Sequence, residues 1–170
     1  MPGTIPLSEL LLPELESELA KTRRILAALP DGQLEFKPHE KSMALAKLAG
    51  HIAELPAFTS IILTVPSLDV AAPNSPRKPV VMETAAQLVA QFDLAAEKAV
   101  AALKNTSDAA FEETWSLSRG PMAIYSGTRY GAYRAFGVNH IIHHRAQLGS
   151  YIRLLNHPLP GTYGPSADGM

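Results

Sequence analysis

The amino-acid sequence predicts an all-α protein built as a bundle of four helices. Four segments place apolar residues three and four positions apart, which is the spacing of one face of an α-helix. Ala, Leu and Glu dominate these segments, and all three are strong helix formers. No stretch alternates apolar and polar residues convincingly, as a half-buried strand would. We therefore expect helices joined by connections that contain Pro and Gly, without a sheet.

The first helix is expected over residues 8–29, where leucines recur at helical spacing. Ser8 is a suitable N-cap, and Glu9 in the first turn favours the positive end of the helix dipole. The turn at Pro30 to Gly32 should end this helix.

The second helix should begin near Ser42 and carry an apolar face that includes Leu48, His51 and Leu55. Pro56 lies inside the pattern and should kink or interrupt the helix, because it removes a backbone donor and crowds the preceding turn. Residues 67–79 are rich in proline and break every periodicity. A crossover of this length between the second and third helices allows them to run in the same direction.

The third helix is expected over residues 84–104 and the last over residues 126–155, again from their apolar spacing. The segment between them is less regular. It predicts a helical turn at residues 109–114 and a loop around Gly120 and Pro121. Residues 156–170 should form an irregular tail.

Composition limits the class of protein. A chain of 170 residues with 46% hydrophobic and 18% charged residues fits a single globular domain, here residues 1–170. The net charge of −1, without a clustered basic stripe, argues against a nucleic-acid partner. The absence of cysteine excludes disulfides, thiolate metal ligands and a cysteine nucleophile. Any metal must therefore be bound by imidazole, carboxylate or water.

Targeting signals are not evident. The N-terminus MPGTIPLSEL lacks the basic residues and apolar core of a signal peptide. The longest uncharged stretch, residues 55–68, is too short to span a bilayer. A cytoplasmic protein with no membrane partner is the resulting expectation.

The histidines carry the chemistry. His140 and His144 are four residues apart, so they lie on one helical face and can bind a single ion. They also belong to an apolar stripe that includes Tyr133, Leu148 and Tyr151. Two imidazoles in an apolar core are costly unless their nitrogens are satisfied, and a metal ion satisfies them. The alternative is that both are ordinary surface or hydrogen-bonded histidines.

The other four histidines are candidates for a place in the ligand set. His143 could replace a member of the pair, although its own stripe is more polar and suggests a boundary residue. His51 is the best third ligand, because bundle sites are built from facing helices. His39 and His157 stand beside prolines in expected loops and look like surface residues.

Three histidines without a fourth protein ligand would leave a coordination position for water or substrate, as catalytic sites do. Glu54 could complete the shell or act as a base, but a solvated helix charge is the preferred interpretation. Glu14 and Glu18 are candidates for orienting an imidazole from outside the shell.

Two motifs in these regions resemble the DinB-like family of damage-inducible proteins, which includes metalloenzymes. The resemblance extends over most of the chain, and its two specific motifs are Leu48-Ala49-Gly50-His51-Ile52-Ala53-Glu54-Leu55-Pro56 and His140-Ile141-Ile142-His143-His144-Arg145-Ala146-Gln147-Leu148. The chain has Ala146 where members usually have Gly.

The resemblance implies a four-helix bundle of up-down-down-up connectivity, with a metal triad at His51, His140 and His144. It also implies zinc or nickel as the ion, a homodimer, and a small-molecule substrate in a thiol S-transferase or hydrolase reaction. The alternatives are a non-catalytic stress-response protein with a structural ion, and a plain bundle without metal. Imidazole ligands alone do not select the metal.

Overall fold

The structure is a computed structural model that describes residues 5–77 and 79–169. Its helical elements are α1 (Leu7–Ala27), α2 (Leu45–Thr64), α3 (Ala85–Lys104), α4 (Asp108–Glu112), α5 (Arg129–Ala132), the π-helical segment η1 (Tyr133–Val138) and α6 (Asn139–Leu154). Its strands are β1 (Ser67–Asp69), β2 (Thr114–Arg119) and β3 (Met122–Thr128). The chain is therefore mostly helical, with a small sheet.

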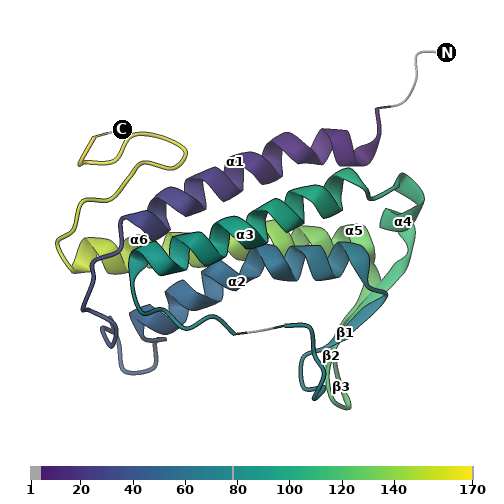
Figure 1. The fold of residues 1–170 in the computed structure, drawn as a ribbon, viewed down its shortest axis with the longest axis horizontal. Coiled ribbons are helices and arrows are strands. Elements are labelled where there is room, and N and C mark those ends of the chain that lie inside the picture. Colours follow the sequence, from purple (N-terminus) through teal and green to yellow (C-terminus); the bar gives the residue numbers. More distant parts are fainter. Residues whose placement is uncertain (1–4, 78, 170) are drawn as a thin grey trace.

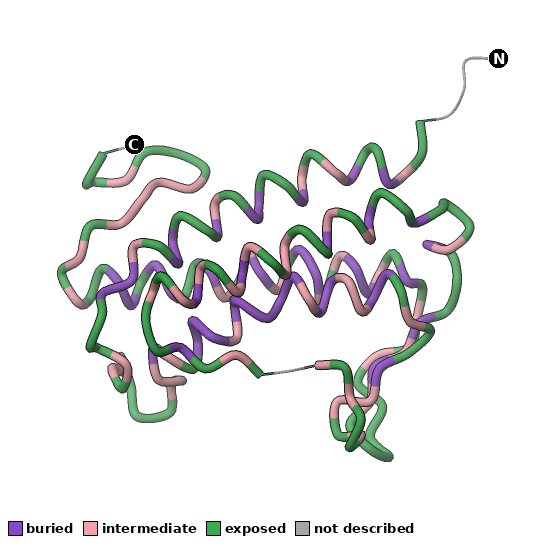
Figure 2. The backbone as a smooth tube through the Cα atoms, viewed as in Figure 1, coloured by how far each residue is buried: buried purple, intermediate pink, exposed green. Residues whose placement is uncertain are grey.

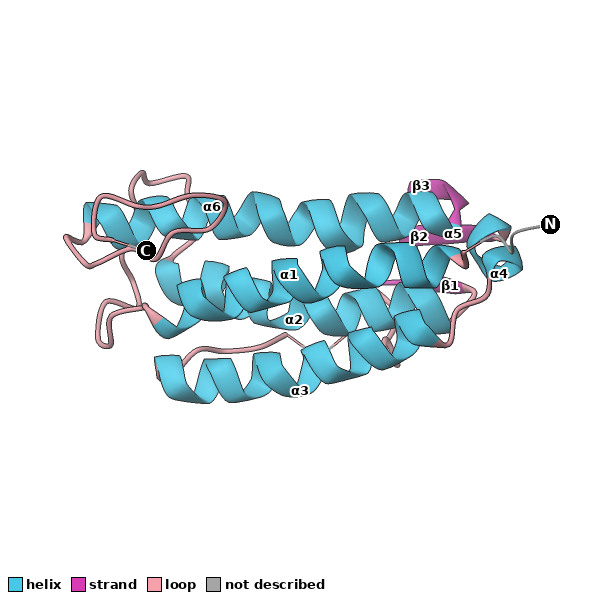
Figure 3. Ribbon diagram, turned by 90° about the horizontal axis from the view of Figure 1, so that it is seen from above, coloured by secondary structure: helices cyan, strands magenta, loops and turns pink. Residues whose placement is uncertain are grey.

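Four long rods form the body of the molecule, namely α1, α2, α3 and the continuous run α5–η1–α6 (Figures 1 and 3). Buried residues line the faces that these rods turn toward one another, and exposed residues line the outside (Figure 2). Each rod contributes fully buried side chains to one core, including Leu15, Ile52, Phe92, Tyr133 and Leu148. Among the described residues, no helix combines the length and the hydropathy needed to cross a bilayer.

The small sheet corrects the prediction of an all-α protein. Strand β1 pairs with β2 in parallel, and β2 pairs with β3 in an antiparallel hairpin. Residues 115–118 of β2 do alternate, since Trp115 and Leu117 are buried and the serine after each of them is partly exposed. This alternation covers too few residues to be separated from a loop by pattern alone.

Buried polar contacts attach the sheet to the bundle. Trp115 Nε1 donates to the carbonyl oxygen of Val65, just past the end of α2. The guanidinium of the buried Arg129 donates to the carbonyls of Ile62 and Val65 and to the carboxylate of Glu113. These bonds satisfy orphan carbonyls at the C-terminal end of α2, so they fix the sheet against that end.

The helix boundaries differ from the expected ones at several points. Pro6 precedes the first residue of α1, and Ser8 is buried in the first turn, so the prediction of Ser8 as N-cap was wrong. Helix α2 begins at Leu45 and continues through Pro56 without interruption. Residues 126–128, expected to open the last helix, belong to β3 instead. Helix α3 starts as expected, with the Thr84 hydroxyl accepting a hydrogen bond from the backbone N–H of Gln87.

The connection between α2 and α3 returns along the bundle from the sheet end to the opposite end (Figure 1). It passes so close to α2 that a Cβ on Gly50 would lie 2.2 Å from the carbonyl oxygen of Val80. Glycine is required there for this close approach. The connection therefore lies beside the part of α2 that carries His51.

Candidate metal centre

Two facing helical rods position the three histidines. His51 lies on α2, and His140 and His144 lie one turn apart on α6. Immediately before His140 the rod widens into the π-helical segment η1. Gly137 in this segment allows a close approach to α2, since a Cβ there would lie 3.2 Å from Thr59 Oγ1. Single π-helical turns are frequent at functional sites, and this one sets the register of the two histidines that follow.

The three Nε2 atoms converge on one point. His140 Nε2 lies 3.3 Å from His51 Nε2 and 2.9 Å from His144 Nε2. A ligand atom from each ring falls within 4.8 Å of the other two, and all three residues are partly buried. The structure therefore brings together residues from two distant stretches of the chain, as the sequence analysis expected.

Hydrogen-bond acceptors engage the outer nitrogens of two of these rings. His51 Nδ1 lies 2.7 Å from Glu54 Oε1, and His144 Nδ1 lies 2.7 Å from Gln147 Oε1. The buried Nδ1 of His140 turns toward the Phe136 carbonyl of the preceding turn without a close hydrogen bond. Because a carboxylate can only accept, His51 Nδ1 must donate, and in the neutral ring this leaves the lone pair on Nε2, facing the cluster.

Burial keeps the two histidines of α6 neutral near pH 7. Burial, reinforced by the neighbouring rings of His144 and His51, lowers the pKa of His140 to about 4. Burial also lowers the pKa of His144, against the opposing effect of its hydrogen bond with Gln147. Neutral imidazole is the form that binds metal ions.

This arrangement fits a divalent metal ion. Zinc binds imidazole nitrogen at about 2.0–2.1 Å, so two ligands of a tetrahedral ion lie about 3.3 Å apart. The two Nε2 separations of 3.3 and 2.9 Å are close to that value. Ring nitrogens this close to one another repel wherever their lone pairs face each other, unless a cation or a proton lies between them.

The group has no fourth protein ligand among the described His, Asp and Glu residues. A cavity of 210 Å³ instead opens beside His51 and His140. A second cavity, of 270 Å³, reaches His51 from the side of the crossover. The larger cavity of 620 Å³ beneath the C-terminal tail contains none of the three histidines.

Glu54 differs from the expectation of a solvated helix charge. Its side chain is only 6% exposed, and Oε1 accepts from both His51 Nδ1 and the Arg77 guanidinium. Burial alone would raise the pKa of Glu54, but the hydrogen bonds from His51 and Arg77 outweigh it and hold the pKa below its ordinary value. Glu54 is therefore an anion that orients His51 from behind, on the side away from the converging nitrogens.

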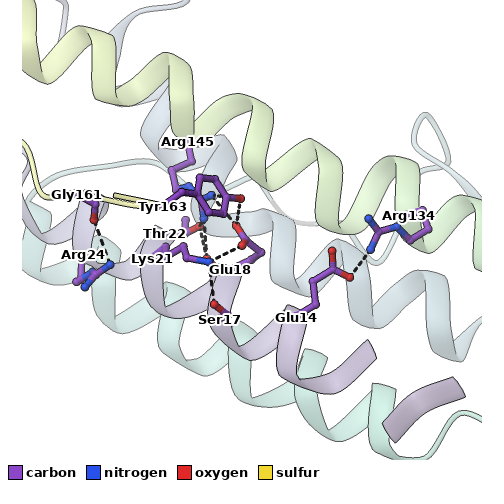
Figure 4. A network of polar contacts seen from close by, with 10 residues as sticks. All are labelled: Glu14, Ser17, Glu18, Lys21, Thr22, Arg24, Arg134, Arg145, Gly161 and Tyr163. Atoms are coloured by element: carbon purple, nitrogen blue, oxygen red, sulfur yellow. Dashed lines mark hydrogen bonds and ion pairs between the residues drawn. The ribbon is translucent and has the colours of Figure 1, made fainter. Parts of the chain in front are cut away.

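Glu14 and Glu18, expected as candidates to orient an imidazole, are engaged elsewhere (Figure 4). Glu14 pairs with Arg134. The buried Glu18 pairs with Arg145 and also accepts hydrogen bonds from Lys21 and Tyr163. Neither carboxylate is hydrogen-bonded to the histidine cluster, so that expectation was wrong.

The other histidines lie outside the cluster. His143 is exposed, with its ring 4.8 Å from that of His144 between centroids. His39 is exposed, and His157 is partly buried near the end of α6.

Sequence reasoning missed Gln147, Arg77 and Arg119 near this centre. Gln147 could have been found, because a residue three positions after His144 lies beside it on a helix. Arg77 comes from the crossover and Arg119 from β2, and no local pattern connects either with the histidines.

The fold and the site together define a helical-bundle protein with a candidate three-histidine metal centre beside a cavity. The model of the DinB family matches residues 5–170, so the chain belongs to the DinB family. None of the curated proteins compared with the chain matches it.

Solved structures share this fold. A DinB-like protein from Bacillus cereus is 18% identical, with a TM-score of 0.69, covering 93% of this chain and 98% of its own. The DinB-like protein YjoA from Bacillus subtilis is 19% identical, with a TM-score of 0.68 and coverage of 90% and 97%. YfiT from Bacillus subtilis is described as a probable metal-dependent hydrolase with an unusual four-helix bundle topology. It is 16% identical, with a TM-score of 0.64 and coverage of 92% and 93%.

Proposed function

We propose that this DinB-family protein is a metal-dependent enzyme that binds one divalent ion through His51, His140 and His144. The reaction is a hydrolysis or a thiol S-transfer on a small electrophilic molecule. The convergence of three Nε2 atoms beside a cavity carries this proposal. The description of YfiT as a probable metal-dependent hydrolase supports it.

The chain's own residues have separate roles in this proposal. His51, His140 and His144 hold the ion, while Glu54 and Gln147 fix the ring orientations from outside. A divalent ion at this position supplies Lewis acidity, which makes water or a thiol a competent nucleophile near neutral pH. The cavity beside His51 and His140 gives the small molecule access to that side of the cluster.

The metal ligands are tested by metal analysis of the purified protein and of variants loaded with zinc or nickel. We expect wild type to retain a single ion per chain after desalting, and His51→Ala and His140→Ala to retain much less. His143→Ala is the matched control, because it removes an exposed imidazole from the same helix. An unchanged metal content in His140→Ala would contradict the proposed ligand set.

Catalysis is tested separately with the metal-loaded protein, using a panel of esters, amides, low-molecular-weight thiols and electrophiles. Turnover that disappears in His51→Ala and persists in His143→Ala supports the enzyme. Metal binding with no turnover, together with a large fall in melting temperature on metal removal, supports instead a structural ion in a non-catalytic stress-response protein.

Several finer features of the proposal rest on the family. These are zinc or nickel as the ion, a homodimer, a cytoplasmic location and up-down-down-up connectivity of the four rods. The long return of the α2–α3 connection in Figure 1 supports the last of these. Sedimentation velocity of the metal-loaded protein tests the homodimer.

A further inference from the structure

The cavity beside His51 and His140 has one apolar wall built by two parts of the fold. Leu55 and Phe58 of α2 and Phe136 of η1 come from the bundle, and Leu117 and Ile124 come from the hairpin. The pairing of β2 with β3 shifts register between Leu117 and Ser118, which leaves Ile124 as an extra residue on β3. Such a bulge redirects side chains, and here Ile124 lines the cavity while remaining 44% exposed.

The charged residues that line this cavity are Glu54, Arg77 and Arg119. The Oε1 atom of Glu54 is occupied by His51 and Arg77, so these groups largely compensate one another. Arg119 is exposed at the end of β2, and its side chain has no hydrogen-bond or ion-pair partner among residues 5–77 and 79–169. The neighbouring cavity on the other side of the Glu54–Arg77 pair is lined by another cation, Lys47.

We propose that this cavity takes a small carboxylate-bearing molecule whose anionic group pairs with Arg119 and whose apolar body lies against Phe58 and Leu117. This inference rests on the proposed function, since it names the class of substrate that the same site would take. A guanidinium matches a carboxylate through two parallel hydrogen bonds, and an apolar wall accepts the remainder of such a molecule.

Cavity size limits the ligand further. Pockets for drug-sized molecules span about 300–1,000 Å³, whereas this cavity has 210 Å³. The occupant is therefore a small acid of the size of an aryl or alkyl carboxylate. His51 and His140 line the same cavity as Arg119, so a ligand held by Arg119 lies in the space that adjoins the metal centre.

The test compares phenylacetate with its neutral counterpart phenylacetamide in NMR titrations that follow millimolar binding. Both probes are titrated into the metal-free and the zinc-loaded protein. We expect phenylacetate to bind about threefold to fivefold more tightly in both forms, which is the upper range for an ion pair with an exposed arginine. Arg119→Gln should abolish this preference, and Arg119→Lys should keep part of it.

Arg23→Gln is the matched control, because Arg23 is an exposed arginine on α1 that pairs with Asp93 and lines neither cavity at His51. It changes the net charge equally and should keep the preference for phenylacetate. A preference that survives Arg119→Gln, or that is lost equally in Arg23→Gln, would overturn the assignment to Arg119. Failure of both probes to bind would overturn the cavity as a site for this class.

The two forms of the protein separate this inference from the proposed function. If the preference appears only with zinc and does not depend on Arg119, the carboxylate binds the ion directly and the inference fails while the metal site stands. If the chain binds no metal yet retains an Arg119-dependent preference, the proposed function fails and the acid-binding cavity stands.

Discussion

Helix α6 contributes to two polar clusters that differ in how completely their atoms are paired. His144 faces α2 and the other two histidines, whereas its neighbour Arg145 faces α1 and the carboxylate of Glu18. In the Arg145 cluster, Glu18 Oε2 accepts from Arg145 and Tyr163, and Oε1 accepts from Lys21 (Figure 4). In the histidine cluster, the three Nε2 atoms meet one another, and no other residue of the described part of the chain donates a hydrogen bond to them.

A structural cluster and a binding cluster can be told apart by whether their polar atoms are already paired. The buried ion pair of Glu18 and Arg145 has its partners present and ties α1, α6 and the C-terminal tail together. Its polar atoms are already hydrogen-bonded, so they do not need a ligand. Converging acceptors, two of them held by a partner on the outer nitrogen, are complete only when a cation is added. The first cluster should therefore govern stability, and the second should govern metal binding.

The largest expected effect comes from breaking the Arg145 cluster. Glu18→Ala leaves the guanidinium of Arg145 buried without its carboxylate, since Glu18 and Arg145 are 4% and 3% exposed. We expect a loss of about 3–5 kcal/mol in the free energy of unfolding, measured by urea denaturation. Glu14→Ala, one turn earlier, removes a half-exposed pair with Arg134 and should cost only about 0–1 kcal/mol. Equal losses in both variants would contradict the comparison.

Metal loading should stabilise the protein through the histidine cluster alone. At a free zinc concentration about 100 times Kd, binding to the folded state adds about 2.7 kcal/mol to the free energy of unfolding. We expect this increment in wild type and in His143→Ala, and its loss in His140→Ala, by thermal denaturation with and without zinc. The metal-free forms of all three proteins should unfold at similar temperatures. A large destabilisation of metal-free His140→Ala would show that the ring is a structural residue instead.

Two glycine variants, one in α2 and one in α6, test the crossover that brings Arg77 to Glu54. The expected change in stability is smaller than in the tests above. Gly50→Ala forces the Val80 carbonyl away from α2, because the added Cβ would lie 2.2 Å from its oxygen. We expect a loss of about 1–3 kcal/mol in urea denaturation, with weaker zinc binding. In Gly149→Ala of α6, the added Cβ would meet only Leu159, at ordinary contact distance. That variant should be neutral or up to about 1 kcal/mol more stable, and a similar loss there would exclude the crossover as the cause.

The smallest expected effect is the contribution of Glu18 to the pH dependence of the free energy of unfolding. Burial alone would raise the pKa of Glu18, but hydrogen bonds from Lys21, Tyr163 and Arg145 hold it below the ordinary value of 4.5. A depressed carboxyl pKa stabilises the fold above the unfolded-state pKa and loses that contribution as pH falls through the folded-state pKa. Below pH 4.5 the slope of stability against pH should therefore be shallower in Glu18→Gln, by at most about 1.4 kcal/mol per pH unit. Parallel slopes in urea denaturation would contradict this role.

Local sequence signals predicted the main helices and the histidine pair of α6. His140 and His144 could be paired because a spacing of four on an apolar stripe fixes their relative position within one helix. The start of α3 was predicted from its apolar spacing, and Thr84 caps the helix there through its own side chain. Each of these features depends on residues within a turn or two of one another.

The features that were missed depend on contacts between distant segments. Strand β1 pairs Ser67 with Ser116 of β2, and neither strand carries a pattern long enough to predict that partner. The burial of Glu54 follows from Arg77, which the crossover brings in from elsewhere in the chain. Glu18 was assigned to the wrong cluster for the same reason, because its partners Arg145 and Tyr163 are far away in sequence.

The parallel pairing of β1 with β2 has a consequence for the order in which the protein folds. Helices form from local contacts, whereas this pairing must close a loop that contains all of α3 and α4. We therefore expect the hairpin to dock late, after the rods have assembled, and to detach without global unfolding. In native-state hydrogen exchange, the amides of β2 and β3 should exchange sooner than those in the middle of α2. The wall that carries Leu117 and Arg119 would then be the most easily opened side of the cavity.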